Sequence, residues 1–232
     1  MRSDEHPGAG ESLLQNVILA GSSGHASVIA DAIEKQGKYR IAGCVDSFRP
    51  AGMASFGYPI LGPESLLPEL EREYDLEGAV IGIGDNWQRA RMAQKIRDLT
   101  RLKMPVVIHP SAQMARTATI EEGTVIFANA VVNSGAKIGQ LCILNTASSL
   151  DHDCEMKAYA SLAPGSTVGG RSVIGEFSAI CLGARVIHGR RIGDHTVIGA
   201  GAVVLEDTPD LVVAYGVPSR VIRKRQAGDP YL

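Results

Sequence analysis

The chain has 232 residues, enough for one large domain or two small ones, and its formal net charge is −2. This near-neutral balance gives no reason to expect a nucleic-acid partner or binding to a lipid surface. No apolar run has the length of a signal peptide or a membrane span, so a cytoplasmic protein without membrane association is expected.

The first half of the chain alternates short apolar runs with amphipathic stretches. Residues 1–14 are polar and predict a disordered N-terminus. The pattern predicts strands at 16–21, 39–46, 78–84 and 105–108, helices at 26–36, 64–73 and 86–100, and a connection at 57–62. Because strand and helix alternate, residues 15–107 are predicted to form a small Rossmann-like α/β domain with a parallel sheet.

Glycines and small polar residues follow the predicted strands, at the edge where parallel sheets bind ligands. The first strand is followed by Gly21-Ser22-Ser23-Gly24-His25, and uncapped amides at a helix start favour phosphate. The second ends in Asp46-Ser47, where an acid often takes ribose or sugar hydroxyls. The turn lacks the GxGxxG spacing, which argues against a full dinucleotide site, and ordinary βα turns are the alternative interpretation.

The second half has a strict period of six. Seventeen aliphatic residues recur in register from Ile108 to Val204, each followed four positions later by a small residue, except that Arg190 takes one such place. This period is the hexapeptide signature of a parallel β-helix, in which three hexads close a triangular coil of about 18 residues. Residues 108–209 are therefore predicted to form a prism whose coils stack at about 4.8 Å.

Two further features concern the cysteines and the C-terminus. Cys142 and Cys154 fall in the small-residue position of the repeat, which predicts buried packing rather than a disulfide or metal site. No His/Cys spacing typical of a metal site is present in the sequence. Residues 210–232 are predicted to be a C-terminal strand and tail, whose basic residues could meet phosphates or lie on a solvated helix face.

One hexad carries a histidine between two acids, Asp151-His152-Asp153. A carboxylate beside an imidazole selects one tautomer and raises its basicity, as a general base requires. Counting three hexads forward places Gly170 directly above His152, leaving a notch with an exposed amide that suits a carbonyl gaining negative charge. His188 is expected two coils away, about 10 Å. The alternative is a surface histidine bonded to its neighbours.

Together these motifs resemble a known family, the two-domain hexapeptide acyltransferases. This family includes bacterial sugar-nucleotide N-acetyltransferases of the bacillosamine and perosamine type and the sialic acid O-acetyltransferases. The resemblance spans residues 16–225 and rests on Gly21 to His25, Asp46, Ile83 to Asn86, His109 to Ala112, Asn145-Thr146, Asp151 to Cys154, Ala163-Pro164-Gly165 and Gly216-Val217-Pro218.

The resemblance implies a homotrimer of left-handed β-helices that uses acetyl-CoA, without a metal, and binds a nucleotide-activated amino sugar in the α/β domain. It implies that His152 removes the amine proton, that Asp153 raises the basicity of His152, and that the Gly170 amide contacts the acetyl oxygen. It carries sugar-nucleotide contacts over to Ser23, Gly24, His25, Asp46, Ser47 and Gly84. Cofactor contacts carry over to Leu182 and Ala200.

The sequence departs from the family pattern at three positions. Ser161 stands where family members commonly have a histidine that touches the cofactor. Ser47 stands where the second of two acids is often found. Arg190, in a small-residue position, suggests a swollen turn near the cofactor groove.

The sequence is compatible with three functions. The first is acetyl transfer from acetyl-CoA to the amino group of a nucleotide-linked amino (dideoxy) sugar in the synthesis of a surface polysaccharide or glycan, with His152 as general base. The second is O-acetylation of a sialic acid or a related sugar hydroxyl. The third is a non-catalytic trimeric β-helix scaffold.

Overall fold

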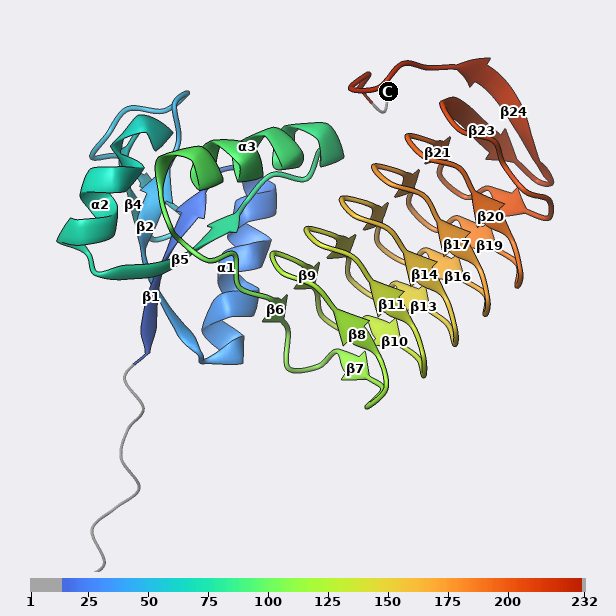
Figure 1. Ribbon diagram of the computed structural model, residues 1–232, viewed down its shortest axis with the longest axis horizontal. Helices are drawn as coiled ribbons and strands as arrows, with labels where there is room; N and C mark the ends of the chain where they lie inside the picture. The colour runs from blue at the N-terminus through green and yellow to red at the C-terminus, as the bar shows by residue number, and fades with distance from the viewer. Residues whose placement is uncertain (1–13, 231–232) are drawn as a thin grey trace, which may run out of the picture.

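The computed structural model describes residues 14–230, so the predicted disordered segment 1–14 lies outside the described residues apart from Leu14. An α/β domain leads into a long prism of stacked coils (Figure 1). This confirms the predicted fold class, a small parallel α/β sheet followed by a left-handed parallel β-helix. Within residues 14–230, no helix has the length and apolarity needed to cross a membrane.

The α/β domain contains a five-stranded sheet in the order β3-β4-β2-β1-β5. Its strands are β1 (Gln15–Ala20), β2 (Tyr39–Val45), β3 (Ala54–Ser55), β4 (Tyr58–Gly62) and β5 (Leu76–Ile81). Its helices are α1 (Gly24–Gln36), a 3-10 turn (Glu64–Leu66), α2 (Leu67–Glu73) and α3 (Asn86–Leu99). β2 and β5 pair in parallel with β1, so the carboxyl ends of these strands meet at one edge.

The expectation that residues 57–62 form a connection is wrong. Tyr58–Gly62 is β4, which pairs in parallel with β2 and forms an antiparallel hairpin with β3. The flanking glycines and Pro59 hide this strand in the sequence, because these residues usually mark turns. Pro59 precedes the residues of β4 that pair with β2, which are Ile60 and Gly62, so its missing amide interrupts neither of these pairs.

The prism is built from seventeen two-residue strands, β6 to β22. In order they are Val107–Ile108, Gln113–Met114, Thr119–Ile120, Val125–Ile126, Val131–Val132, Lys137–Ile138, Ile143–Leu144, Ser149–Leu150, Glu155–Met156, Ser161–Leu162, Thr167–Val168, Val173–Ile174, Ala179–Ile180, Arg185–Val186, Arg191–Ile192, Val197–Ile198 and Val203–Val204.

These strands form three parallel sheets, which are the faces of the prism. Face 1 runs from β7 to β22 and face 2 from β8 to β20, each taking every third strand. Face 3 runs from β6 to β21 and continues into β23 (Val212–Gly216) and the antiparallel β24 (Ser219–Lys224). The basic C-terminal residues thus lie on a strand, so the alternative of a terminal helix is wrong.

From β6 to β19, each strand pairs with the third strand after it, as β10 pairs with β13 through Val131 and Ser149, which confirms the predicted coil of three hexads. The second residue of each strand points inward, and the aliphatic side chains from Ile126 to Val204 form one buried core. Cys142 and Cys154 are buried in this core as free thiols, as predicted. Arg190 lies at the edge between faces 1 and 2, where its backbone amide donates to Ser172 Oγ.

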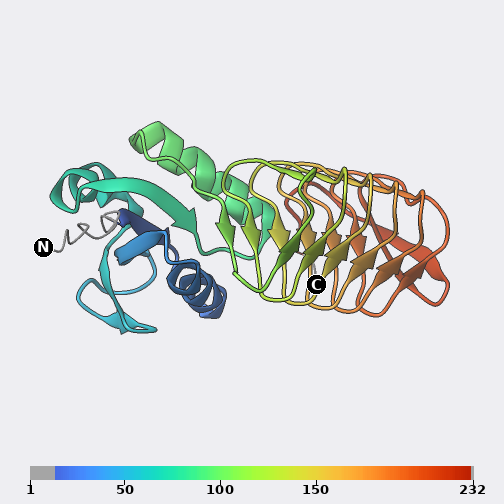
Figure 2. The ribbon, with the colours of Figure 1, turned by 90° about the horizontal axis from the view of Figure 1, so that it is seen from below.

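The α/β domain packs against the first coils of the prism through α1 and α3. From α1, Ile29 and Ile33 share a buried cluster with Val125, Phe127 and Ile143 of face 3. Helix α3 packs along the edge between faces 2 and 3 (Figures 1 and 2). The α/β domain therefore covers the lower part of face 3 and leaves its upper strands, β15 to β23, outside this contact.

The Arg89 side chain of α3 is the polar centre of this contact and is only 1% exposed. Its guanidinium donates to the backbone oxygens of Leu141 (2.8 Å) and Tyr159 (2.9 Å) on two consecutive coils. It also donates to Gly84 O (2.9 Å) and Asn86 Oδ1 (2.7 Å) in its own domain. A buried charge is tolerated only when it is hydrogen-bonded, so this residue fixes α3 to one position on the prism.

A column of rings lies along the same edge. Tyr159, Phe177 and His195 come from three consecutive coils and stack with ring centroids 4.7 Å apart at both steps. Trp87 of α3 contacts Phe177 and His195 at 5.4 and 5.9 Å. After β24 the chain returns to this edge, where Arg225 Nη1 donates to His195 O (3.0 Å).

We expect Arg89→Met to lower the free energy of unfolding by about 2–4 kcal/mol, because it leaves buried carbonyl oxygens of two coils without their donor. Urea denaturation followed by circular dichroism measures the change. The matched control is Arg101→Met, at an exposed arginine, which should change stability by at most about 0.5 kcal/mol. Equal losses in the two variants would contradict this role of Arg89.

Candidate functional site

His152 lies on the edge between faces 1 and 2, with its side chain 47% exposed. Its Nδ1 is 2.9 Å from Asp153 Oδ2, and Asp153 occupies the left-handed backbone region at φ 57°. When Nδ1 donates this hydrogen bond, Nε2 is left as the proton acceptor of the ring. The pair thus has the arrangement of a general base held by a carboxylate.

Asp151 holds the backbone of the same turn. Its Oδ1 accepts from Asn133 Nδ2 (2.8 Å) and from the His152 backbone amide (2.7 Å). The hydrogen bonds from Asn133 and from this amide lower the pKa of Asp151. Asp151 therefore remains ionised and holds the backbone of the turn, whereas Asp153 contacts the imidazole.

Gly170 lies directly against the imidazole, as its offset of one coil predicts. A Cβ atom at Gly170 would be 2.5 Å from His152 Nε2 and 2.8 Å from its ring carbons. Any side chain here would displace the ring, so glycine allows the observed position of Nε2. His188 lies exposed on the same edge, two coils further along.

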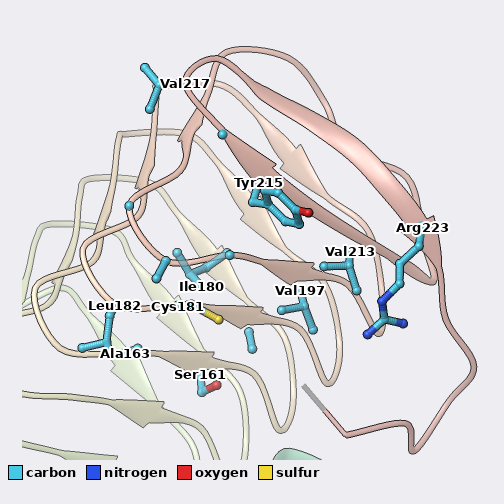
Figure 3. Close-up of a pocket in the computed structure, with 15 residues that line it drawn as sticks. Ser161, Ala163, Ile180, Cys181, Leu182, Val197, Val213, Tyr215, Val217 and Arg223 are labelled. Atoms are coloured by element: carbon cyan, nitrogen blue, oxygen red, sulfur yellow. The ribbon is translucent and has the colours of Figure 1, made fainter. Parts of the chain in front are cut away.

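A groove of about 910 Å³ lies on the upper part of face 3 (Figure 3). Its floor comes from Ala179, Val197 and Val213, which are at most 7% exposed. Figure 3 shows Tyr215 and Val217 of the C-terminal hairpin and, on its second strand, Arg223. The groove has an apolar floor with a cationic group at one end.

Three of the predicted cofactor residues, Ser161, Leu182 and Ala200, line this groove. The fourth, Gly170, lies on the edge between faces 1 and 2 with His152. Arg190 also belongs to that edge, so within one chain its turn does not line the groove of Leu182 and Ala200, and its place near a cofactor stays a prediction. A triangular prism places the edge between faces 1 and 2 opposite face 3, so a single chain keeps His152 away from the groove.

A second pocket, of about 770 Å³, lies at the carboxyl ends of β1, β2 and β5. It is lined by Gly21, Ser22, Ser23, Asp46, Ser47, Phe48, Glu64, Gly82, Ile83, Gly84, Gln88, Arg91, Met92 and Lys95. The predicted residues Ser23, Asp46, Ser47 and Gly84 are thus brought together, whereas Gly24 and His25 do not line it. Ser23 is the N-cap of α1 and leaves the first amides without a side-chain cap, which suits an anion.

Asp46 connects two of the loops around this pocket. Its Oδ2 accepts from the Ser22 backbone amide (3.1 Å) and hydroxyl (2.5 Å), and its Oδ1 accepts from the Phe48 amide (2.8 Å). The acid expected to take sugar hydroxyls therefore also holds the β1–α1 turn against the loop after β2.

A second carboxylate reaches this loop from another element. Glu64, 4% exposed, accepts from the Ser47 amide (3.2 Å) and hydroxyl, and forms an ion pair with Lys95 (2.8 Å). Burial opposes its ionisation, but the hydrogen bonds from Lys95 and Ser47 outweigh burial, so the pKa of Glu64 is lowered. Glu64 thus supplies an acid next to Ser47, where the sequence pattern lacks one.

His25 packs between the two domains. Its ring meets Phe127 of the prism edge-on at 5.6 Å, and it lies next to Gly84. Burial, together with the charge of Arg89, lowers the pKa of His25 to about 4. A neutral imidazole at the domain contact follows from this environment.

Sequence reasoning missed Phe48, Glu64, Arg91 and Lys95. Arg91 and Lys95 are on α3, four residues apart on one helix face, which is a signal visible in the sequence. Glu64 carries no such signal, because only the fold brings the 3-10 turn beside Ser47.

A comparison with known proteins finds the PglD N-terminal domain over residues 16–96. A histidine-to-alanine variant of GDP-perosamine N-acetyltransferase from Caulobacter crescentus, solved with CoA and GDP-perosamine, is 35% identical with a TM-score of 0.86, covering 93% of this chain and 100% of that one. The acetyltransferase domain of PglB from Neisseria gonorrhoeae, solved with acetyl coenzyme A, is 31% identical with a TM-score of 0.83, covering 90% and 100%.

Among curated proteins, UDP-N-acetylbacillosamine N-acetyltransferase from Bacillus subtilis is 33% identical over 116 residues, which is 50% of this chain and 52% of that protein. The chain spans about half the length of the curated relatives it matches.

The neutral His25 makes stability depend on pH. Between pH 6.5 and about 4 the unfolded chain binds a proton at His25 that the folded chain does not, so the free energy of unfolding falls as pH falls through this window. We expect a contribution of about 3 kcal/mol across it. Urea denaturation at several pH values measures this slope, and the control His25→Gln should have a correspondingly flatter one.

Proposed function

The chain belongs to the family of hexapeptide-repeat sugar-nucleotide N-acetyltransferases, and we propose that it transfers the acetyl group of acetyl-CoA to the amino group of a nucleotide-linked amino (dideoxy) sugar. The observation that supports this most is the His152–Asp153 pair, whose imidazole Nε2 lies at Gly170. Relatives that match across nearly the whole chain have been crystallised with CoA, acetyl coenzyme A or GDP-perosamine.

The reaction needs two proton transfers, one from the amine to His152 and one from His152 to the leaving thiolate. Acetyl-CoA supplies an activated thioester carbonyl. His152 Nε2 accepts the proton of the amine as its nitrogen bonds to the carbonyl carbon, and the C–S bond then breaks. The imidazolium, stabilised by Asp153, returns that proton to the departing thiolate sulfur. A donor at the Gly170 backbone amide would stabilise the oxygen that becomes negative in between.

The two substrates would occupy the two pockets. The uncapped start of α1 suits a diphosphate, so the pocket of the α/β domain would hold the nucleotide part of the acceptor. The apolar floor of the face 3 groove suits the uncharged arm of a CoA thioester, and Arg223 at its end suits a phosphate.

A homotrimer would complete the site. Because His152 lies on the edge opposite face 3 of its own prism, the groove of one chain can receive His152 only from another chain. We therefore propose parallel prisms in which each groove faces the His152 edge of its neighbour.

Replacing the base tests the chemistry. His152→Ala should lower turnover by about 10²–10⁴, because a positioned general base typically contributes that much. The control is Arg101→Ala, at an exposed arginine that lies outside both pockets and away from the His152 edge, and it should keep near-normal turnover. Thiol release with UDP-, GDP- and dTDP-linked amino sugars measures the rate. Free sialic acid in the same screen tests the hydroxyl acceptor. A His152→Ala enzyme as active as the control would refute the assignment.

Mixing two inactive variants tests the shared site. Leu182→Asp places a charge in the groove at a side chain that is 58% exposed, and His152→Ala removes the base. Co-assembled at equal amounts, the two variants should recover about a quarter of the wild-type activity. Random assembly places the intact groove of a His152→Ala chain against the intact base of a Leu182→Asp chain at about a quarter of the interfaces. No recovery, with trimers confirmed by light scattering, would place groove and base within one chain.

A further inference from the structure

We propose that Phe48 is the residue on which the nucleobase of the acceptor stacks, an inference that rests on the proposed function. Phe48 lines the pocket of the α/β domain and is 96% exposed. A large aromatic side chain left almost wholly in water gives up the stabilisation that burial provides. A flat apolar ring at the rim of a pocket that suits a nucleotide is the arrangement that stacks on a base.

The backbone of the loop that carries Phe48 is held from both sides. The Phe48 amide donates to Asp46 Oδ1 (2.8 Å). The amide and hydroxyl of the preceding Ser47 both donate to Glu64. Glu64 is in turn paired with Lys95 of α3. These contacts fix the backbone before any ligand arrives, which lowers the ordering cost of binding.

The position of Phe48 matches the nucleoside end of the pocket. The first amides of α1 follow β1 and suit the diphosphate. β2 is the neighbouring strand on one side, and the residues after the second strand of such sheets face the nucleoside. β5 is the neighbour on the other side, where Gly84 lies next to His25, whose ring meets Phe127 of the prism. The acceptor would therefore lie with its base at Phe48 and its sugar toward the prism.

Calorimetric titration of the full-length protein with UDP, GDP, dTDP and acetyl-CoA tests this. Phe48→Ala should weaken the nucleoside diphosphate that the wild-type protein binds by about 5- to 100-fold, the range expected for one stacked base. Phe48→Tyr should retain the affinity. Acetyl-CoA binding should stay unchanged, because the groove on face 3 is separate. Val28→Ala, at another exposed apolar side chain, is the matched control.

The outcomes separate this inference from the proposed function. If the wild-type protein binds a nucleoside diphosphate and Phe48→Ala binds it equally well, the stacking role is wrong and the proposed function stands. If the wild-type protein binds none of the three, the proposed function fails first. If Phe48→Ala weakens acetyl-CoA to the same extent, Phe48 acts through the fold, which also overturns the inference.

Discussion

One buried guanidinium fixes the position of the α/β domain relative to the prism. Arg89 contacts backbone oxygens on two consecutive coils and in its own domain, so it joins α3 to the prism at a defined height. The opposite side of α3 presents Gln88, Arg91 and Lys95 to the α/β pocket. Because the same helix contacts the prism and lines the pocket, it fixes the position of the pocket relative to the prism as well as to the sheet of its own domain.

Much of the prism could be predicted because each period of six residues in the sequence corresponds to one strand and one turn of a coil. Every neighbour across coils lies three hexads away along the chain, so the contact of Gly170 with His152 followed from counting alone. The α/β domain was harder. β4 resembled a connection, since Pro59 and the glycines around it are turn residues. The partners of Ser47 and Phe48 could not be predicted, because hydrogen bonds to Glu64 and Asp46 depend on how separate loops pack.

The geometry also distinguishes two ways of using a carboxylate. Asp153 contacts an imidazole on an exposed edge, where a charge can assist a proton transfer. Asp46 and Glu64 hold loops, and each accepts hydrogen bonds from more than one donor. The position of Asp46 in the sequence predicted a ligand-binding role. The structure adds that its carboxylate holds the loops of Ser22 and Phe48. A loop held by hydrogen bonds to two carboxyl groups is stiff without ligand, which suits a pocket that must select one nucleotide among several.

The docking of α3 on the coils of Leu141 and Tyr159 has an evolutionary consequence. His152 lies between these two residues in the sequence, so the height of the base relative to the α/β pocket is set by the anchored coils themselves. Coils beyond Tyr159 contribute most of the groove. Duplication of a whole coil after His195, which Trp87 of α3 contacts, would lengthen the groove by about 4.8 Å and leave the base in place. Donor and acceptor preferences can therefore diverge independently in proteins of this design.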